Sequence, residues 1–114
     1  MLTDRDRIRL ISAINEPPQL AFDLLRERCS GEKQFKEVVR AAIESLQEEL
    51  VLDQKGQMYF LPGSCGEGRD SELFRVLVNS DDLIKIGRAF ARSRYWATTR
   101  PREFENLLLS YLED

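Results

Sequence analysis

Residues 32–50, EKQFKEVVRAAIESLQEEL, carry the clearest periodic pattern in the chain. Their apolar side chains recur at the three- and four-residue spacing of an amphipathic helix, at Phe35, Val38, Val39, Ala42, Ile43, Leu46 and Leu50. This spacing predicts one helix with a single buried face. Its polar face changes sign along its length, from Lys33, Lys36 and Arg40 to Glu44, Glu48 and Glu49. The helix therefore offers positive charge at its start and negative charge at its end.

Two shorter helices are predicted before this segment. In residues 3–15, Thr3 is a suitable N-cap and three isoleucines recur at helical spacing, at Ile8, Ile11 and Ile14. Residues 18–29 follow a break at two prolines and place five apolar residues on one face, Leu20, Ala21, Leu24, Leu25 and Cys29. Ser30 and Gly31 end this helix. We expect both apolar faces to be buried.

The pattern changes after residue 50. In residues 50–62 two apolar runs flank a polar turn, which predicts a short β-hairpin with Gly56 at positive φ. Residues 62–70 are glycine-rich and predict a loop, whereas residues 71–79 fit a helix or a strand, with helix favoured. Two further helices are predicted, over residues 83–96 and 101–112. The expected fold is mainly α with a small β-hairpin.

Three helices followed by a hairpin resemble the winged helix-turn-helix superfamily over residues 3–62. The run LQEELVLDQKGQMYFL, residues 46–61, is similar to the end of its recognition helix and its wing. The resemblance implies a winged-helix-like domain at residues 1–62 and a C-terminal helical extension at residues 63–114, packed together as one compact unit. It also implies that the third helix enters the DNA major groove and that the wing contacts the DNA backbone. The basic side chains that would then face DNA are Lys33, Lys36 and Arg40 on the helix and Lys55 on the wing.

Composition excludes several classes of protein. The chain has 114 residues, of which 42% are hydrophobic and 32% charged, and no apolar run is long enough for a membrane span. There is no histidine and there are only two cysteines, so we predict no catalytic site, no cofactor and no metal site. Residues 63–68 match the first part of a phosphate-binding loop, but Arg69 and Asp70 stand where it needs Lys and Ser or Thr. We expect a non-enzymatic, cytoplasmic protein.

Basic charge is concentrated near the C-terminal end. The chain carries a formal net charge of −3, yet residues 83–102 contain no acidic residue and six basic ones, Lys85, Arg88, Arg92, Arg94, Arg100 and Arg102. Tyr95 and Trp96 lie among them, and arginines beside aromatic rings are suited to nucleic acid and also to protein interfaces. A third interpretation is that this segment pairs with the acidic part of its own chain and that its rings are buried.

Two functions follow from these patterns. The first is a small DNA-binding winged-helix protein, a transcriptional regulator or accessory factor that contacts duplex DNA through the third helix and the basic segment and forms a homodimer on a two-fold site. The second is a protein-interaction adaptor with an architectural winged helix, whose leucine-rich C-terminal helix binds an acidic protein partner or a second copy. The acidic second half of the 32–50 helix favours the adaptor.

Overall fold

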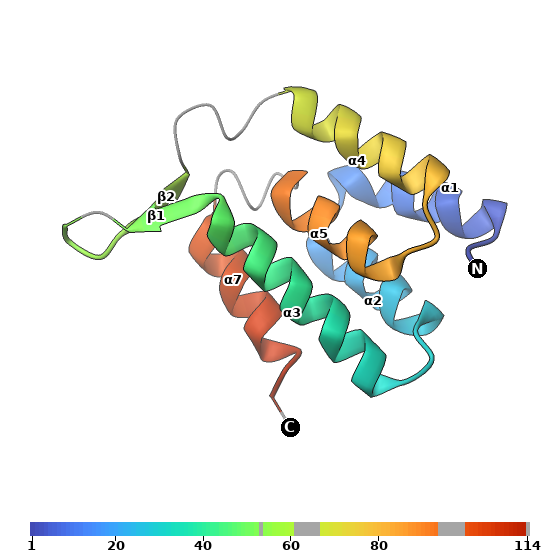
Figure 1. Cartoon of the computed structure of the whole chain (residues 1–114), viewed down its shortest axis with the longest axis horizontal. Helices are drawn as coiled ribbons and strands as arrows, with labels where there is room; N and C mark the ends of the chain where they lie inside the picture. Colours follow the sequence, from blue (N-terminus) through green and yellow to red (C-terminus); the bar gives the residue numbers. More distant parts are fainter. Residues whose placement is uncertain (53, 61–66, 94–99, 114) are drawn as a thin grey trace.

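The structure, a computed structural model, describes residues 1–52, 54–60, 67–93 and 100–113, and only the backbone of residues 51, 58–60 and 67–70. This part of the chain is mainly helical, as predicted (Figure 1). In chain order its elements are α1 (Asp4–Ser12), the 3₁₀ turn η1 (Ala13–Asn15), α2 (Pro18–Arg28), α3 (Glu32–Glu48), β1 (Leu50–Leu52), β2 (Met58–Phe60), α4 (Glu67–Asn79), α5 (Leu83–Ser93) and α7 (Pro101–Ser110).

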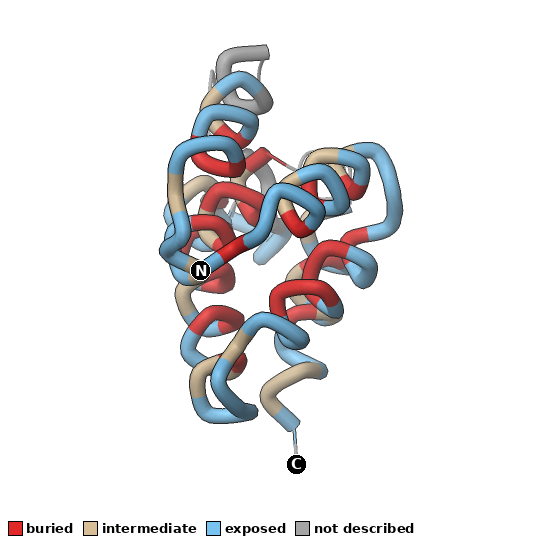
Figure 2. The backbone as a smooth tube through the Cα atoms, turned by 90° about the vertical axis from the view of Figure 1, so that its right-hand side faces the viewer, coloured by how far each residue is buried: buried red, intermediate tan, exposed pale blue. Residues whose placement is uncertain are grey.

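Helix α3 lies at the centre of the molecule and makes its most extensive contacts with α5. The two helices run parallel, because α4 lies on the far side of α5 from α3 and runs in the opposite direction (Figure 1). They approach closely because α5 has glycine at residue 87. A Cβ atom there would lie 2.7 Å from Cγ1 of Val38, closer than two carbon atoms pack. Figure 2 shows buried residues along the sides where helices face one another.

Helix α7 and its C-cap residue, Tyr111, contact both α2 and α3 through aromatic rings. The ring of Tyr111 lies 5.4 Å from that of Phe35 and 6.1 Å from that of Phe22, and Phe104 lies 6.4 Å from Phe22. The guanidinium of Arg26 lies 4.4 Å from the centre of the Phe35 ring, a cation–π geometry. Phe104 and Leu108 are buried, so the apolar side of this leucine-rich helix is used within the molecule.

Polar contacts attach α1 to both α2 and α4. Thr3 and Asp6 form a reciprocal capping box at the start of α1, and Asp6 also accepts a charged contact of 2.9 Å from Arg28 at the end of α2. Arg7 donates to the carbonyl oxygens of Leu77 and Ser80 at the end of α4. These carbonyls lack partners within their own helix, so Arg7 caps α4 from outside.

A short turn connects the two strands. β1 and β2 pair antiparallel, with Leu50 opposite Phe60 and Leu52 opposite Met58. Gly56 has a φ of 77°, a conformation that favours glycine. Arg102 of α7 donates a hydrogen bond of 3.2 Å to the carbonyl oxygen of Gly56. The turn therefore lies beside the start of α7.

Some predicted boundaries and faces need correction. Residues 71–79 are helical, as favoured, but α4 begins at Glu67, inside the predicted loop. Helix α3 ends at Glu48, and Leu50 belongs to β1.

Two residues predicted to be buried lie on the surface. Ile8 is 64% exposed and Leu20 is 52% exposed. The buried side of α1 is centred instead on Leu10 and Ala13, because the contact between Asp6 and α2 turns that side inward.

Candidate interaction surfaces

The arginines of α5 lie against acidic side chains of the same chain. Arg88 is half-buried, with its Nη2 atom 3.4 Å from Oε2 of Glu48 and its Nη1 atom 3.9 Å from Oε2 of Glu44. Arg92 is also half-buried, and its Nη2 atom lies 2.8 Å from Oε1 of Glu72 in α4. Of the predicted cations on α5, Lys85 is exposed. The charge of this helix is thus partly neutralised before any partner arrives.

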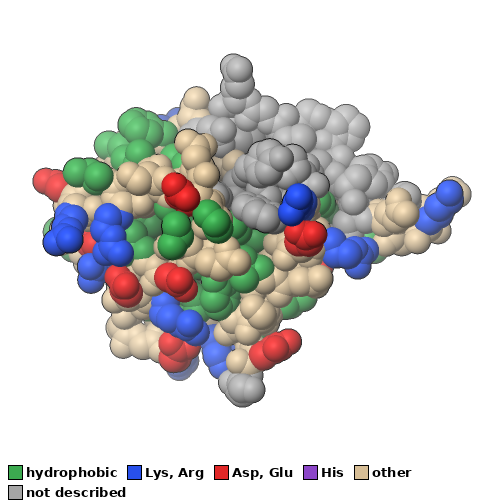
Figure 3. Space-filling model, turned by 180° about the vertical axis from the view of Figure 1, so that it is seen from behind, with side chains coloured by type: hydrophobic (Ala, Val, Ile, Leu, Met, Phe, Trp, Pro, Cys, Tyr) green, Lys and Arg blue, Asp and Glu red, His purple; other side chains and the backbone are tan. Residues whose placement is uncertain are grey.

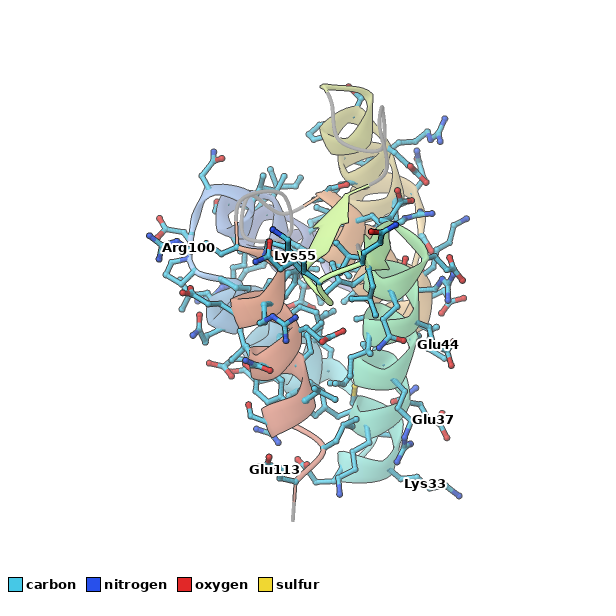
Figure 4. All side chains as sticks on the ribbon, turned by 90° about the vertical axis from the view of Figure 1, so that its left-hand side faces the viewer. Lys33, Glu37, Glu44, Lys55, Arg100 and Glu113 are labelled. Carbon is cyan, nitrogen blue, oxygen red and sulfur yellow. The ribbon has the colours of Figure 1, made fainter. Side chains whose placement is uncertain are left out.

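The basic residues at the start of α7 lie beside the strands. Arg100 is 3.6 Å from Glu103, and Arg102 donates to Gly56 next to Lys55. Lys55 and Arg100 lie near one end of α3, whereas Lys33 lies at the other end (Figure 4). Three predicted site residues, Arg94, Tyr95 and Trp96, lie outside the described residues. Among the described residues, Lys33 therefore lies far from Lys55 and Arg100 (Figure 4).

The outer face of α3 carries both signs of charge. Lys33 and Arg40 are exposed and Lys36 is half-buried. Glu37 and Glu44 point outward from the same helix as Lys33 (Figure 4). Acidic groups between basic ones weaken the attraction of this face for phosphate groups.

An apolar surface that the sequence did not predict lies on the other side of the molecule. Besides Ile8 and Leu20, the side chains of Phe74 and Val78 on α4 are 52% and 44% exposed. Figure 3 shows hydrophobic side chains on this face, in the left half of the view, over α4, α1 and α2. Exposed apolar groups that share a face are typical of protein-interaction sites.

A hollow of about 440 Å³ opens between α1 and α2 within this surface. It is lined by Ile8, Arg9, Ser12, Ala13, Glu16, Leu20 and Leu24. Arg9 stands at its edge, 3.6 Å from Glu27 of α2. The small side chains of Ser12 and Ala13 leave the space that larger residues would fill. One sequence signal could have revealed this hollow. The apolar residues near the start of the chain do not all fall on one side of a helix, because Ile8 lies apart from Leu10 and Ala13.

The titratable groups with shifted pKa values belong to the packing of the fold. A hydrogen bond from the backbone of Thr3 lowers the pKa of Asp6, and Arg28 lowers it further. Burial raises the pKa of the Cys29 thiol, with a contribution from Glu32, and burial also raises the pKa of Tyr111. A raised thiol pKa keeps Cys29 protonated and poorly nucleophilic. Residues 63–66 of the predicted glycine loop, including Cys65, are outside the described part of the chain.

The described residues form neither a metal-binding cluster nor a membrane-spanning helix. Across residues 1–52, 54–60, 67–93 and 100–113, no group of three or more His, Cys, Asp or Glu side chains is arranged to hold a metal ion. The helices in the same ranges are too short or too polar to cross a bilayer.

Comparison with known proteins gives no match: no family model, no curated protein and no solved structure matches the chain.

Proposed function

We propose that the protein is a non-enzymatic protein-interaction module in which a winged-helix-like part has an architectural role. The observation that carries this proposal is the position of α3, which packs along α5 and also contacts α7. A recognition helix must leave one long face open to enter the major groove. On α3 the face that remains carries Glu37 and Glu44 beside its basic residues.

Charge pairing supports the same function. Arg88 and Arg92 already face Glu48 and Glu72, so phosphates would have to compete with carboxylates for these guanidinium groups. The affinity of a protein for DNA rises with the number of phosphates that it neutralises. Cations that are already paired contribute little to that number.

The order α1, α2, α3, β1, β2 supports a winged-helix-like arrangement for the first half of the chain. Winged helices also serve in protein assemblies, since a fold does not fix a function. The exposed apolar groups on α1, α2 and α4 supply the kind of surface that an adaptor needs.

DNA binding is the second candidate, and one observation favours it. Lys33 and Arg40 are exposed on α3, where the resemblance places DNA contacts, and Lys85 is exposed on α5. A regulator that used these residues would contact few phosphates and would bind DNA weakly.

Fluorescence anisotropy with a labelled random DNA duplex, titrated at several salt concentrations, tests the choice between the two. We expect no saturable binding at micromolar protein, even at low salt. Binding whose logarithm falls steeply with log salt, by about 0.9 for each phosphate contacted, would instead establish the DNA-binding function. In that event the Lys33→Glu/Arg40→Glu variant should lose the binding.

A pull-down experiment provides the complementary test: the chain is immobilised, and the proteins that it retains are measured. Partners held by the wild-type chain should be lost from an Ile8→Glu/Leu20→Glu variant and kept by a Lys33→Glu/Arg40→Glu variant. Loss from the second variant alone would show that the charged face of α3, and not the apolar surface, binds the partner. Retention by neither the wild-type chain nor the variants would contradict the proposed interaction function.

A further inference from the structure

We infer that the hollow between α1 and α2 binds α1 of a second copy of this chain, in an antiparallel arrangement about a two-fold axis. The inference rests on the proposed interaction function and names the partner. It depends on the shape of the hollow and on the order of charges along α1.

The exposed side of α1 has opposite charges at its two ends. Arg5, Ile8 and Ser12 follow one another at spacings of three and four residues within α1, so they lie along one side of the helix. Glu16 follows the 3₁₀ turn η1 and lines the hollow together with Ile8 and Ser12. Arg5 and Glu16 are both exposed, and neither side chain makes an ion pair within the described residues.

An antiparallel copy brings these opposite charges together. If residue 5 of one copy meets residue 16 of the other, two-fold symmetry repeats the pair at the far end. Both copies then gain an ion pair that neither has alone. A parallel copy would instead set Arg5 against Arg5 and Glu16 against Glu16.

The same arrangement matches large side chains to small ones. With residues 5 and 16 opposed, Ile8 of one copy comes close to the part of the hollow that Ser12 and Ala13 line in the other. Ile8 is the most exposed apolar side chain lining the hollow, and Ala13 is among the smallest. Each Ile8 can therefore enter the space beside Ser12 and Ala13, with Leu20 and Leu24 behind it. Apolar area is removed from water on both sides of the two-fold axis at once.

The positive charge of Arg9, in the middle of the proposed contact, is already paired with Glu27 of the same chain. Arg9 would lie near the axis, opposite Ser12 of the other copy and not far from the other Arg9. Its pairing with Glu27 of its own α2 reduces the repulsion between the two guanidinium groups. The surface is small beside a standard interface, so we expect a dimer with a dissociation constant in the micromolar range.

Sedimentation velocity over a range of concentrations tests this arrangement. The wild-type chain should shift from monomer to dimer, and Ile8→Glu should remain monomeric because it would bury a charge opposite Ala13. Leu109→Glu is the matched control, because Leu109 is also exposed, at 42%, but lies on α7. That control should dimerise like the wild-type chain. Since Ile8 and Leu109 are on the surface, neither change should impair folding.

Charge exchange gives the more specific test. Arg5→Glu and Glu16→Arg should each weaken the dimer about tenfold, since each places two like-charged pairs across the axis. An equimolar mixture of the two variants should dimerise again. In the mixed dimer, the substituted positions 5 and 16 carry opposite charges and face each other, and the unchanged Arg5 faces the unchanged Glu16.

Three outcomes would overturn the inference: a monomeric wild-type chain, a dimer unaffected by Ile8→Glu, or a mixture that stays as weak as its components. None of these outcomes would prevent the chain from retaining a different protein partner through Ile8 and Leu20. The failure of this inference can therefore be told apart from that of the proposed function.

Discussion

Between α3 and α5 the helices approach until a single added methyl group would collide with Val38, whereas between α1 and α2 they leave a hollow of about 440 Å³. Small residues occur at both places, but their effects are opposite. Gly87 lets two backbones come together, while Ser12 and Ala13 lie between helices whose ends are held by ion pairs from Asp6 and Arg9. A small side chain therefore allows two helices to approach closely where nothing else holds them apart. Where other contacts fix the distance between the helices, it leaves a hollow. The first region is closely packed, and the second is the one for which we propose a binding role.

The largest expected effect is a difference in unfolding free energy between substitutions in the α3–α5 contact and substitutions beside the hollow. Phe90 is fully buried on α5, so Phe90→Ala should lower the free energy of unfolding by about 3–5 kcal/mol. Leu20→Ala, beside the hollow, should change it by no more than about 0.5 kcal/mol. Urea unfolding monitored by circular dichroism measures both values. Equal losses for the two variants would show that α1 and α2 are as tightly packed as α3 and α5.

The next effect concerns the close approach itself. Gly87→Ala should destabilise the protein by about 1–2 kcal/mol, because the overlap with Val38 outweighs the gain of about 1 kcal/mol in helix propensity. In a Val38→Ala background the same substitution should be neutral or stabilising. A stabilising effect of Gly87→Ala in the wild-type background would mean that α5 can move away from α3 without cost.

A pH-dependent effect distinguishes the polar attachment of α1 from apolar packing. The pKa of Asp6 is lowered in the folded chain by the Thr3 backbone and by Arg28, so the ionised form contributes stability above the unfolded value of 3.8. That contribution is lost as pH falls through the lower folded pKa. Asp6→Asn should therefore reduce Tm at neutral pH and converge with the wild-type protein in strong acid. A difference in Tm that stays constant down to the lowest pH would rule out ionised Asp6 as its origin.

The smallest expected effect lies inside α3. The hydroxyl of Ser45 is buried and has no hydrogen-bond partner among the described residues. Ser45→Ala should raise the free energy of unfolding by about 0.5–1 kcal/mol, since it removes an unpaired polar atom and improves helix propensity. Thermal unfolding is sensitive enough to detect the change. A loss of stability would indicate that the hydroxyl does have a partner.

The helical fold could be predicted where one face dominates. On α3 the predicted stripe from Phe35 to Leu46 is buried throughout, because all the large apolar residues fall on one side. On α4 the pattern was ambiguous because two apolar sets overlap. Leu73, Val76 and Leu77 are buried, whereas Phe74 and Val78 are exposed. Phe74, Val76 and Val78 alternate along the sequence and so imitate a strand.

The candidate surfaces were harder to predict because they depend on contacts between distant residues. Arg88 meets Glu48 across 40 residues of sequence, and periodicity carries no information about such a pair. Likewise, Ile8 and Leu20 each fit a buried helical stripe when considered alone. The side of α1 that turns inward depends on contacts with distant residues, such as Asp6 with Arg28 and Arg7 with the end of α4.

Because α3 and α5 pack together but are far apart in the sequence, the core can form only late in synthesis. The two helices are separated by the strands and α4, so a ribosome must make more than thirty further residues after α3 before its partner exists. Until then the longest apolar stripe in the chain has no α5 to cover it, and closing so long a loop adds to the entropic cost of the first contact. Folding should therefore be slower than in a bundle of sequential neighbours, and chains stopped before α5 should be the ones that aggregate or engage chaperones.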